Sequence, residues 1–157
     1  MPADIVASSQ MLHLAAMDDE DLAVISANLQ DAIVRVADMT YLPQTKRFVL
    51  AAARFDWAAA DVGMCERCMT GLHFERVLGV ARTGFDQRDG ETMLILLGIL
   101  FEPAEPPGGA LVLTFSGGAG VRLNVECIEG QMRDIGPRWR VKCVPDHPLE
   151  GETPRPA

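Results

Sequence analysis

Residues 93–101 read Met-Leu-Ile-Leu-Leu-Gly-Ile-Leu-Phe and form the longest apolar run of the chain. The run is too short for a membrane-spanning helix, which needs about 20 residues. Polar and apolar residues do not alternate in it, which is typical of a strand that is covered on both faces. We therefore predict a central strand here, in a chain that is built around a β-sheet.

Downstream of this strand the sequence predicts a turn and a hairpin. Prolines and glycines dominate residues 102–109, which indicates a turn. Two short apolar segments, 110–115 and 121–125, then flank the glycine-rich residues 116–120. Glycines supply the positive φ angles of a tight reversal, so this arrangement predicts a β-hairpin.

Apolar residues spaced three and four apart predict two helices, one towards each end of the chain. The first covers residues 19–32, and Asp18 is placed to accept hydrogen bonds from its exposed amide groups as the N-cap. The second covers residues 125–135, and the Gly-Pro pair at 136–137 ends it. A short edge strand over residues 138–144 follows.

Upstream of the central strand, β-branched and alternating residues predict three further strands. Residues 33–41 and 47–57 form an antiparallel pair, residues 58–71 break the pattern as a surface loop, and residues 75–83 resume it. The chain thus has about six strands and two helices without βα alternation. This predicts an α+β fold with a mainly antiparallel sheet and an N-terminal and a C-terminal helix. The alternative is a partly closed pleckstrin-homology-like barrel.

The length of 157 residues predicts one domain, over residues 12–144. A flexible N-terminus (1–11) precedes it and a disordered Pro-rich tail (145–157) follows it. The formal net charge is −8, and an acidic chain repels phosphate backbones, so we expect no nucleic-acid partner. The chain shows no signal peptide and no segment long enough to span a membrane. We therefore expect a cytoplasmic protein with reduced thiols.

Two groups of residues are candidates for a functional site. Cys65 and Cys68, with His73 near them, could bind zinc, although a full zinc motif has two such cysteine pairs. We favour ordinary thiols over zinc. If the protein is an enzyme whose site is assembled from residues distant in sequence, the first candidates for that site are Arg54, Asp56, His73 and Glu75. Arg54 and Asp56 lie on one face of their strand. If that face points inward, they form a buried pair or bind a polar ligand; if it points outward, which we favour, they are an ordinary exposed pair.

Several segments carry a family resemblance when they are taken together: residues 21–27, 29–32, 41–43, 47–48, 54–55 with Trp57, 72–77, 125–129 and 134–136. They resemble domain-of-unknown-function family 2948 of alphaproteobacteria. The resemblance covers roughly residues 12–147. It implies a small cytoplasmic bacterial protein, but no activity, cofactor or catalytic residue.

The sequence assigns no catalytic residue, no metal and no cofactor. Our first hypothesis is a non-enzymatic binding or interaction module, whose sheet edges or exposed apolar face meet a protein partner or a second copy of the chain. The alternatives are the enzyme with a site of distant residues and the zinc-stabilised protein described above.

Overall fold

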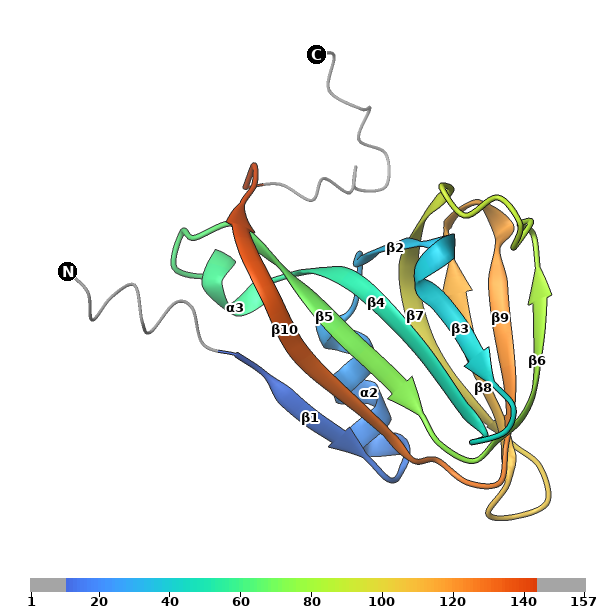
Figure 1. Ribbon diagram of the computed structural model, residues 1–157. Helices are drawn as coiled ribbons and strands as arrows, with labels where there is room; N and C mark the ends of the chain where they lie inside the picture. Colours follow the sequence, from blue (N-terminus) through green and yellow to red (C-terminus); the bar gives the residue numbers. More distant parts are fainter. Residues whose placement is uncertain (1–10, 144–157) are drawn as a thin grey trace, which may run out of the picture.

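The structure is a computed structural model that describes residues 11–143 (Figure 1). Its elements are β1 (His13–Ala16), α2 (Asp19–Asn28), β2 (Ile33–Arg35), the 3₁₀ turn η1 (Val36–Asp38), β3 (Met39–Leu42), β4 (Arg47–Phe55), α3 (Trp57–Ala60), β5 (Glu66–Phe74), β6 (Val77–Thr83), β7 (Met93–Pro103), β8 (Gly109–Phe115), the 3₁₀ turn η2 (Ser116–Gly118), β9 (Gly120–Val125) and β10 (Gly130–Arg140). Neither of the described helices is long and apolar enough to cross a membrane. The two predicted termini lie outside the described residues, apart from Met11.

The ten described strands form one antiparallel sheet in the order β1-β10-β5-β4-β2-β7-β8-β9-β6, and β3 pairs with β4 beside this path. Figure 1 shows two halves, with β1, β10, β5 and β4 on one side and β7, β8, β9 and β6 curling around the other. The short strand β2 joins them, because Ile33 pairs with Ala53 of β4 and with Ile95 of β7. The apolar core lies on the inner face of both halves.

Helix α2 fills the inner side of the sheet. Leu22 and Ile25 are buried, and Leu29 continues the same apolar stripe just beyond the helix. The Ser26 hydroxyl accepts a hydrogen bond from the Ile99 amide at 2.9 Å. Strand β2 pairs only with residues 93–95 of β7, so the Ile99 amide lies beyond that pairing and finds its hydrogen-bond partner in the helix instead. The helix therefore covers an edge of β7 as well as the core.

The sheet is antiparallel as predicted, but the predicted α+β fold of about six strands with an N-terminal and a C-terminal helix is wrong. The described chain has ten strands rather than six, its α-helices are α2 and the four-residue α3, and no α-helix follows α3. Residues 125–135, where we predicted the C-terminal helix, form the end of β9, a turn and the start of β10. Residues 58–71 are not a surface loop, since most of β5 lies there. Of the predicted edge strand over 138–144, residues 138–140 form the end of β10 and pair with β5 on one side only, whereas β1 pairs with residues 130–133.

Other local predictions are confirmed with shorter bounds. The Asp18 carboxylate caps α2 by accepting a hydrogen bond from the Asp21 amide at 2.8 Å. The helix ends at Asn28 rather than at residue 32, because the Asp31 amide instead donates to the Leu96 carbonyl of β7 at 2.8 Å. Strands β8 and β9 form the predicted hairpin. The central strand is also present as β7, but only one face is covered, and Met93 on the other face is 62% exposed.

We predict that Asp18→Ala lowers the free energy of unfolding by about 1 kcal/mol, because the first turn of α2 loses its capping acceptor. Asp19→Asn is the matched control, since it removes a neighbouring charge without touching the cap. Urea unfolding followed by circular dichroism measures both variants. Equal losses in the two variants would contradict the capping role.

Candidate functional site

The four residues of the predicted enzymatic site do not converge. Arg54 points to the inner face of β4, where it is 1% exposed. His73 of β5 pairs with Val49 on the outer face. The register places these positions five residues apart along β4, which is about 16 Å. The sheet therefore separates Arg54 and Asp56 from His73 and Glu75.

Arg54 belongs to a buried cluster around Asp134 of β10. The Arg54 guanidinium donates to both Asp134 carboxylate oxygens, at 3.0 and 2.7 Å. The Thr70 hydroxyl donates to the same carboxylate at 2.7 Å, and the Leu12 amide does so at 2.9 Å. This geometry ties β4, β5 and the residue just before β1 to one side chain of β10. The expectation that Arg54 is exposed is wrong.

Arg138 extends this cluster to Asp56 and Glu66. Its Nη1 donates to the Asp56 carboxylate at 2.8 Å and to the Glu66 carboxylate at 3.2 Å. Asp56 is therefore buried, but its ionic partner is Arg138 and not Arg54. Between Asp134 and Arg138, β10 has three residues where β5 has only one, and the middle one, Gly136, has a φ of 75° that favours glycine.

This Asp134 cluster (Arg54, Asp56, Glu66, Thr70, Asp134 and Arg138) serves structure rather than chemistry. Burial raises the pKa of the Asp134 carboxyl, but the hydrogen bonds that it accepts together bring the pKa below its usual value. Burial and the Asp134 charge raise the pKa of the neighbouring Cys68 thiol, so the thiol stays protonated and unreactive at neutral pH. A buried carboxylate with its hydrogen bonds filled has little capacity left for a substrate.

His73 and Glu75 form a second, separate group on the surface. The His73 Nδ1 and the Glu75 carboxylate lie 2.6 Å apart, and Arg47 Nε lies 2.8 Å from the same carboxylate oxygen. All three side chains are at least one fifth exposed. The group holds the turn between β5 and β6 against the start of β4.

The predicted zinc ligands are not brought together either. Cys65 forms a disulfide with Cys143, so the expectation that all thiols are reduced is also corrected. Cys68 lies on the inner face of β5, opposite Arg54. His73 lies on the outer face, eight residues from Cys65, which is about 26 Å along a strand. Among residues 11–143, no cluster of three metal-ligating side chains is found.

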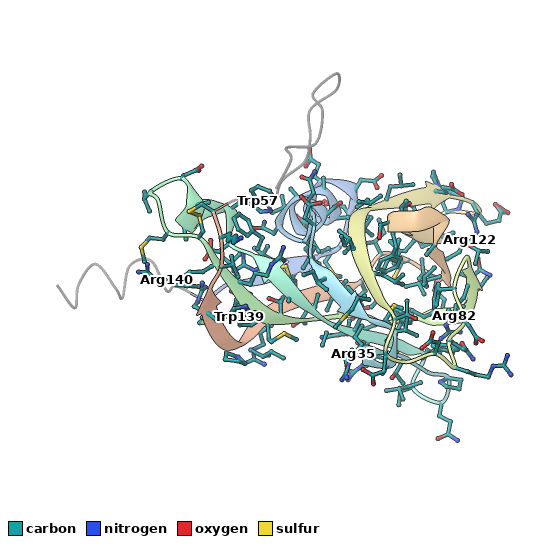
Figure 2. The ribbon with its side chains drawn as sticks, turned by 90° about the horizontal axis from the view of Figure 1, so that it is seen from above. Arg35, Trp57, Arg82, Arg122, Trp139 and Arg140 are labelled. Atoms are coloured by element: carbon teal, nitrogen blue, oxygen red, sulfur yellow. A yellow bond between two sulfur atoms is a disulfide. The ribbon has the colours of Figure 1, made fainter. Side chains whose placement is uncertain are left out.

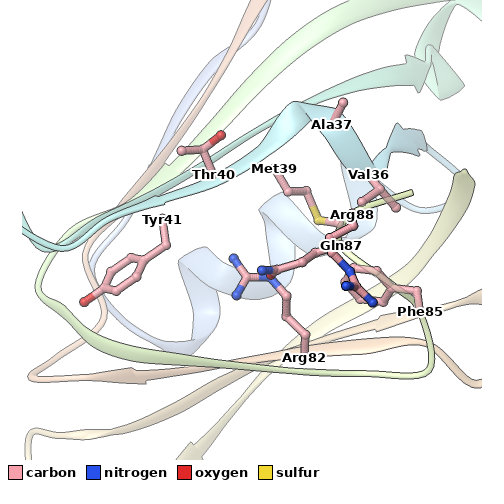
Figure 3. A pocket seen from close by; sticks show the side chains of 9 residues that line it. All are labelled: Val36, Ala37, Met39, Thr40, Tyr41, Arg82, Phe85, Gln87 and Arg88. Carbon is pink, nitrogen blue, oxygen red and sulfur yellow. The ribbon is translucent and has the colours of Figure 1, made fainter. Parts of the chain in front are cut away.

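A cleft of about 330 Å³ lies between β3 and β6, and no sequence motif pointed to it (Figure 3). It opens where β2 passes into η1, because β3 then continues beside β4 alone. One end is closed by the Val77 amide, which donates to the Lys46 carbonyl at 2.8 Å. The Ala37 amide closes the other end by donating to the Gly90 carbonyl at 3.0 Å.

Three side chains of the two strands point into this cleft from the inner face. Met39 and Tyr41 pair with buried residues of β4, and Arg82 pairs with the buried Val121 of β9. In Figure 3 the Arg82 side chain extends into the space between Tyr41 and Phe85. The Tyr41 hydroxyl donates to the Val77 carbonyl at 2.7 Å and so holds the ring in place.

The loop from β6 to β7 forms the remaining wall. Gly84, with a φ of 79°, begins it, and a Cβ atom there would lie 2.8 Å from the Ala119 Cα, so a side chain would displace the loop from the β8–β9 turn. Phe85 follows and is partly buried against the core. The full lining of the cleft combines apolar, polar and cationic side chains: Val36, Ala37, Met39, Thr40, Tyr41, Arg82, Phe85, Gln87 and Arg88.

The charges of the cleft differ from those of the chain as a whole. Its lining contains two arginines and no acidic residue, whereas the whole chain carries a net charge of −8. Arg88 is paired with Asp86 on the outside, with Nε and Oδ1 3.2 Å apart. The Arg82 guanidinium makes no ion pair or hydrogen bond with any other residue of the described chain, 11–143. It is therefore available to an anion that enters the cleft.

Fold and cleft together define an antiparallel β-sheet domain with a cationic, partly apolar cleft between two strand edges. The chain belongs to the family described as a protein of unknown function (DUF2948), which matches residues 12–147. No curated protein and no solved structure matches it. The family resemblance found in the sequence is thus confirmed.

We predict that Asp134→Asn lowers the free energy of unfolding by about 3–5 kcal/mol, because Arg54 is left buried without its carboxylate partner. The lowered pKa of Asp134 contributes stability above the unfolded-state pKa, about 3.9, and this contribution is lost as the pH falls through the native value. As the pH is lowered below 5, the free energy of unfolding of the wild type should therefore fall by more than that of Asp134→Asn. Urea unfolding at each pH measures this, with the exposed Asp86→Asn as control. Parallel pH profiles for wild type and Asp134→Asn would rule out the role of the Asp134 charge.

We also predict that the unreduced, denatured protein exposes two thiols, those of Cys68 and Cys127, and that a reductant raises the number to four. Titration with a thiol-reactive chromophore in guanidinium measures both states. Cys143→Ser is the matched control and should expose three thiols without reductant. Four thiols in the unreduced wild type would contradict the disulfide.

Proposed function

We propose that this protein is a non-enzymatic binding module and that the β3–β6 cleft holds a small, largely apolar anion. The observation that carries the proposal is Arg82, a cation that points inward between two strands and has no partner within residues 11–143. Its neighbours in the cleft include the buried side chains of Val36 and Met39. A ligand with an apolar body and one anionic group matches both features.

The physical balance favours such a ligand. A half-buried guanidinium lies in a medium less polar than water, where a charge-assisted hydrogen bond is about twice as strong as a neutral one. The volume of about 330 Å³ is at the lower end of the roughly 300–1,000 Å³ that ligand pockets have. The acidic remainder of the chain disfavours large polyanions. These features support a small ligand with a single charge.

The composition of the lining supports binding rather than catalysis. The nine lining residues include no His, Cys, Asp, Glu or Lys, which are the usual general acids, bases and nucleophiles. The Tyr41 hydroxyl already donates to a backbone carbonyl. The groups in the cleft are suited to hold a ligand and to orient its charge.

The fluorescent probe 8-anilinonaphthalene-1-sulfonate, an aromatic body with one sulfonate, tests this proposal. We predict that it binds the wild-type protein and that Arg82→Ala weakens binding at least tenfold, because the sulfonate loses its counter-charge. Decanoate should displace the probe. Fluorescence titration measures each dissociation constant.

Two control variants locate the bound probe. Arg122→Ala removes an exposed arginine of β9 that lies outside the cleft lining and is paired with Glu102, with Nη1 and Oε1 2.8 Å apart, and it should change the affinity less than twofold. Ile95→Ser removes an exposed apolar side chain from the outer face of β7, which is not part of the cleft lining, and should also have little effect. Binding that is insensitive to Arg82→Ala, or that depends on Ile95, would contradict the proposal.

A further inference from the structure

We infer that the ligand of the β3–β6 cleft is the carboxyl-terminal end of an extended peptide, which pairs with the free edge of β6 and places its carboxylate on Arg82. This inference rests on the proposed function of the cleft and names the chemical class of its ligand. Three features of the described chain carry it: two strand edges that do not pair with each other beyond Val77, the inward-pointing Arg82, and backbone contacts that close both ends of the cleft.

The walls of the cleft are strand edges with free backbone groups. In the described residues, β6 pairs only with β9 and β3 pairs only with β4. The two edges meet at Val77, through its bonds with Lys46 and Tyr41. Beyond Val77 no backbone hydrogen bond joins β6 to β3 within residues 11–143. Beyond Val77, alternate residues of each edge therefore have N–H and C=O groups without a strand partner among residues 11–143, and Arg82 of β6 lines the cleft itself. An added strand can pair with such groups.

The free edge of β6 carries only some of the devices that limit pairing with other chains. Natural edges are shortened, carry Lys, Pro or inward-pointing charges, or contain β-bulges. β6 has a register shift between Val77 and Gly79 and the inward charge of Arg82, but no Lys and no Pro. The other sheet edge, β1, is only four residues long. By contrast, β6 reads Val-Leu-Gly-Val-Ala-Arg-Thr over seven residues, and its single charge, Arg82, turns into the cleft. This edge is open to a partner strand.

The shape and charge of the cleft select a chain end. The contacts of Val77 with Lys46 and of Ala37 with Gly90 close its two ends, so a peptide cannot pass through it lengthwise. A terminal carboxylate is the group that a peptide end supplies and that a guanidinium binds with two parallel hydrogen bonds. Met39 and Phe85 provide apolar surface for the side chain next to that carboxylate.

Acetylated tetrapeptides ending in Val, Leu or Phe test this inference on the full chain. Each is made as the free acid, as the carboxyl-terminal amide, and as a free acid with one backbone N-methyl group at its third residue. Displacement of the naphthalene sulfonate probe measures binding. We expect at least one free acid to bind, its amide to bind at least tenfold more weakly, and its N-methyl form to bind at least tenfold more weakly.

Variants of the protein separate the two contributions. Arg82→Ala should remove the preference for the acid over the amide but keep the effect of N-methylation, whereas Arg122→Ala, outside the cleft lining, should keep both. Equal binding of the methylated and unmethylated acids would overturn strand pairing. Displacement of the probe by decanoate but by none of the peptides would overturn the inference and leave the proposed function standing. A wild-type protein that binds neither probe nor peptide would overturn both.

Discussion

At η1 the chain turns out of the sheet, and the cleft depends on that turn. Before it, β2 bonds to β4 on one side and to β7 on the other. Within it, the Val36 and Ala37 amides donate to the carbonyls of Thr92 and Gly90 instead of to a strand. After it, β3 follows β4 alone, so β7, β8, β9 and β6 curl away and the β6 edge comes to face β3 (Figure 1). A strand that stayed beside both neighbours would leave no cleft.

The two halves of the sheet use their inward polar groups in different ways. Around Asp134, charged side chains are paired with one another at close range, and such burial is stabilising only because each charge meets an opposite charge. In the other half, Arg82 reaches the inner face without a partner in the described chain. Figure 2 shows Arg82 towards one end of the sheet and Trp57 and Trp139 towards the other. The end with the two tryptophans carries the Asp134 cluster. The first half thus provides a rigid frame, and the second provides a cationic group for a ligand.

The sequence allowed prediction of the elements whose signals are local. The Asp18 cap, the Gly-rich hairpin at 116–120 and the apolar run of β7 depend on neighbouring residues, and each was found. Strands β5 and β10 were missed because polar side chains occupy their inward positions, and alternation then looks broken. Thr70 and Asp134 can be buried only because Thr70 bonds to Asp134 and Asp134 also pairs with Arg54. Asp134 lies 64 residues from Thr70 and 80 residues from Arg54 in the sequence. The cleft was missed for a related reason, since its walls come from two strands that do not pair. The one local signal was an arginine at an inward position of β6.

Amide hydrogen exchange of β6 tests the open edge most directly. Residue-resolved NMR exchange on the full chain without ligand should show protection that alternates along β6, because amides facing β9 are bonded and those facing β3 meet solvent. The central strands β5 and β8, bonded on both sides, should be protected at every residue and serve as the internal reference. Uniform protection along β6 would mean that β3 and β6 are joined in solution, and it would contradict this account of the cleft.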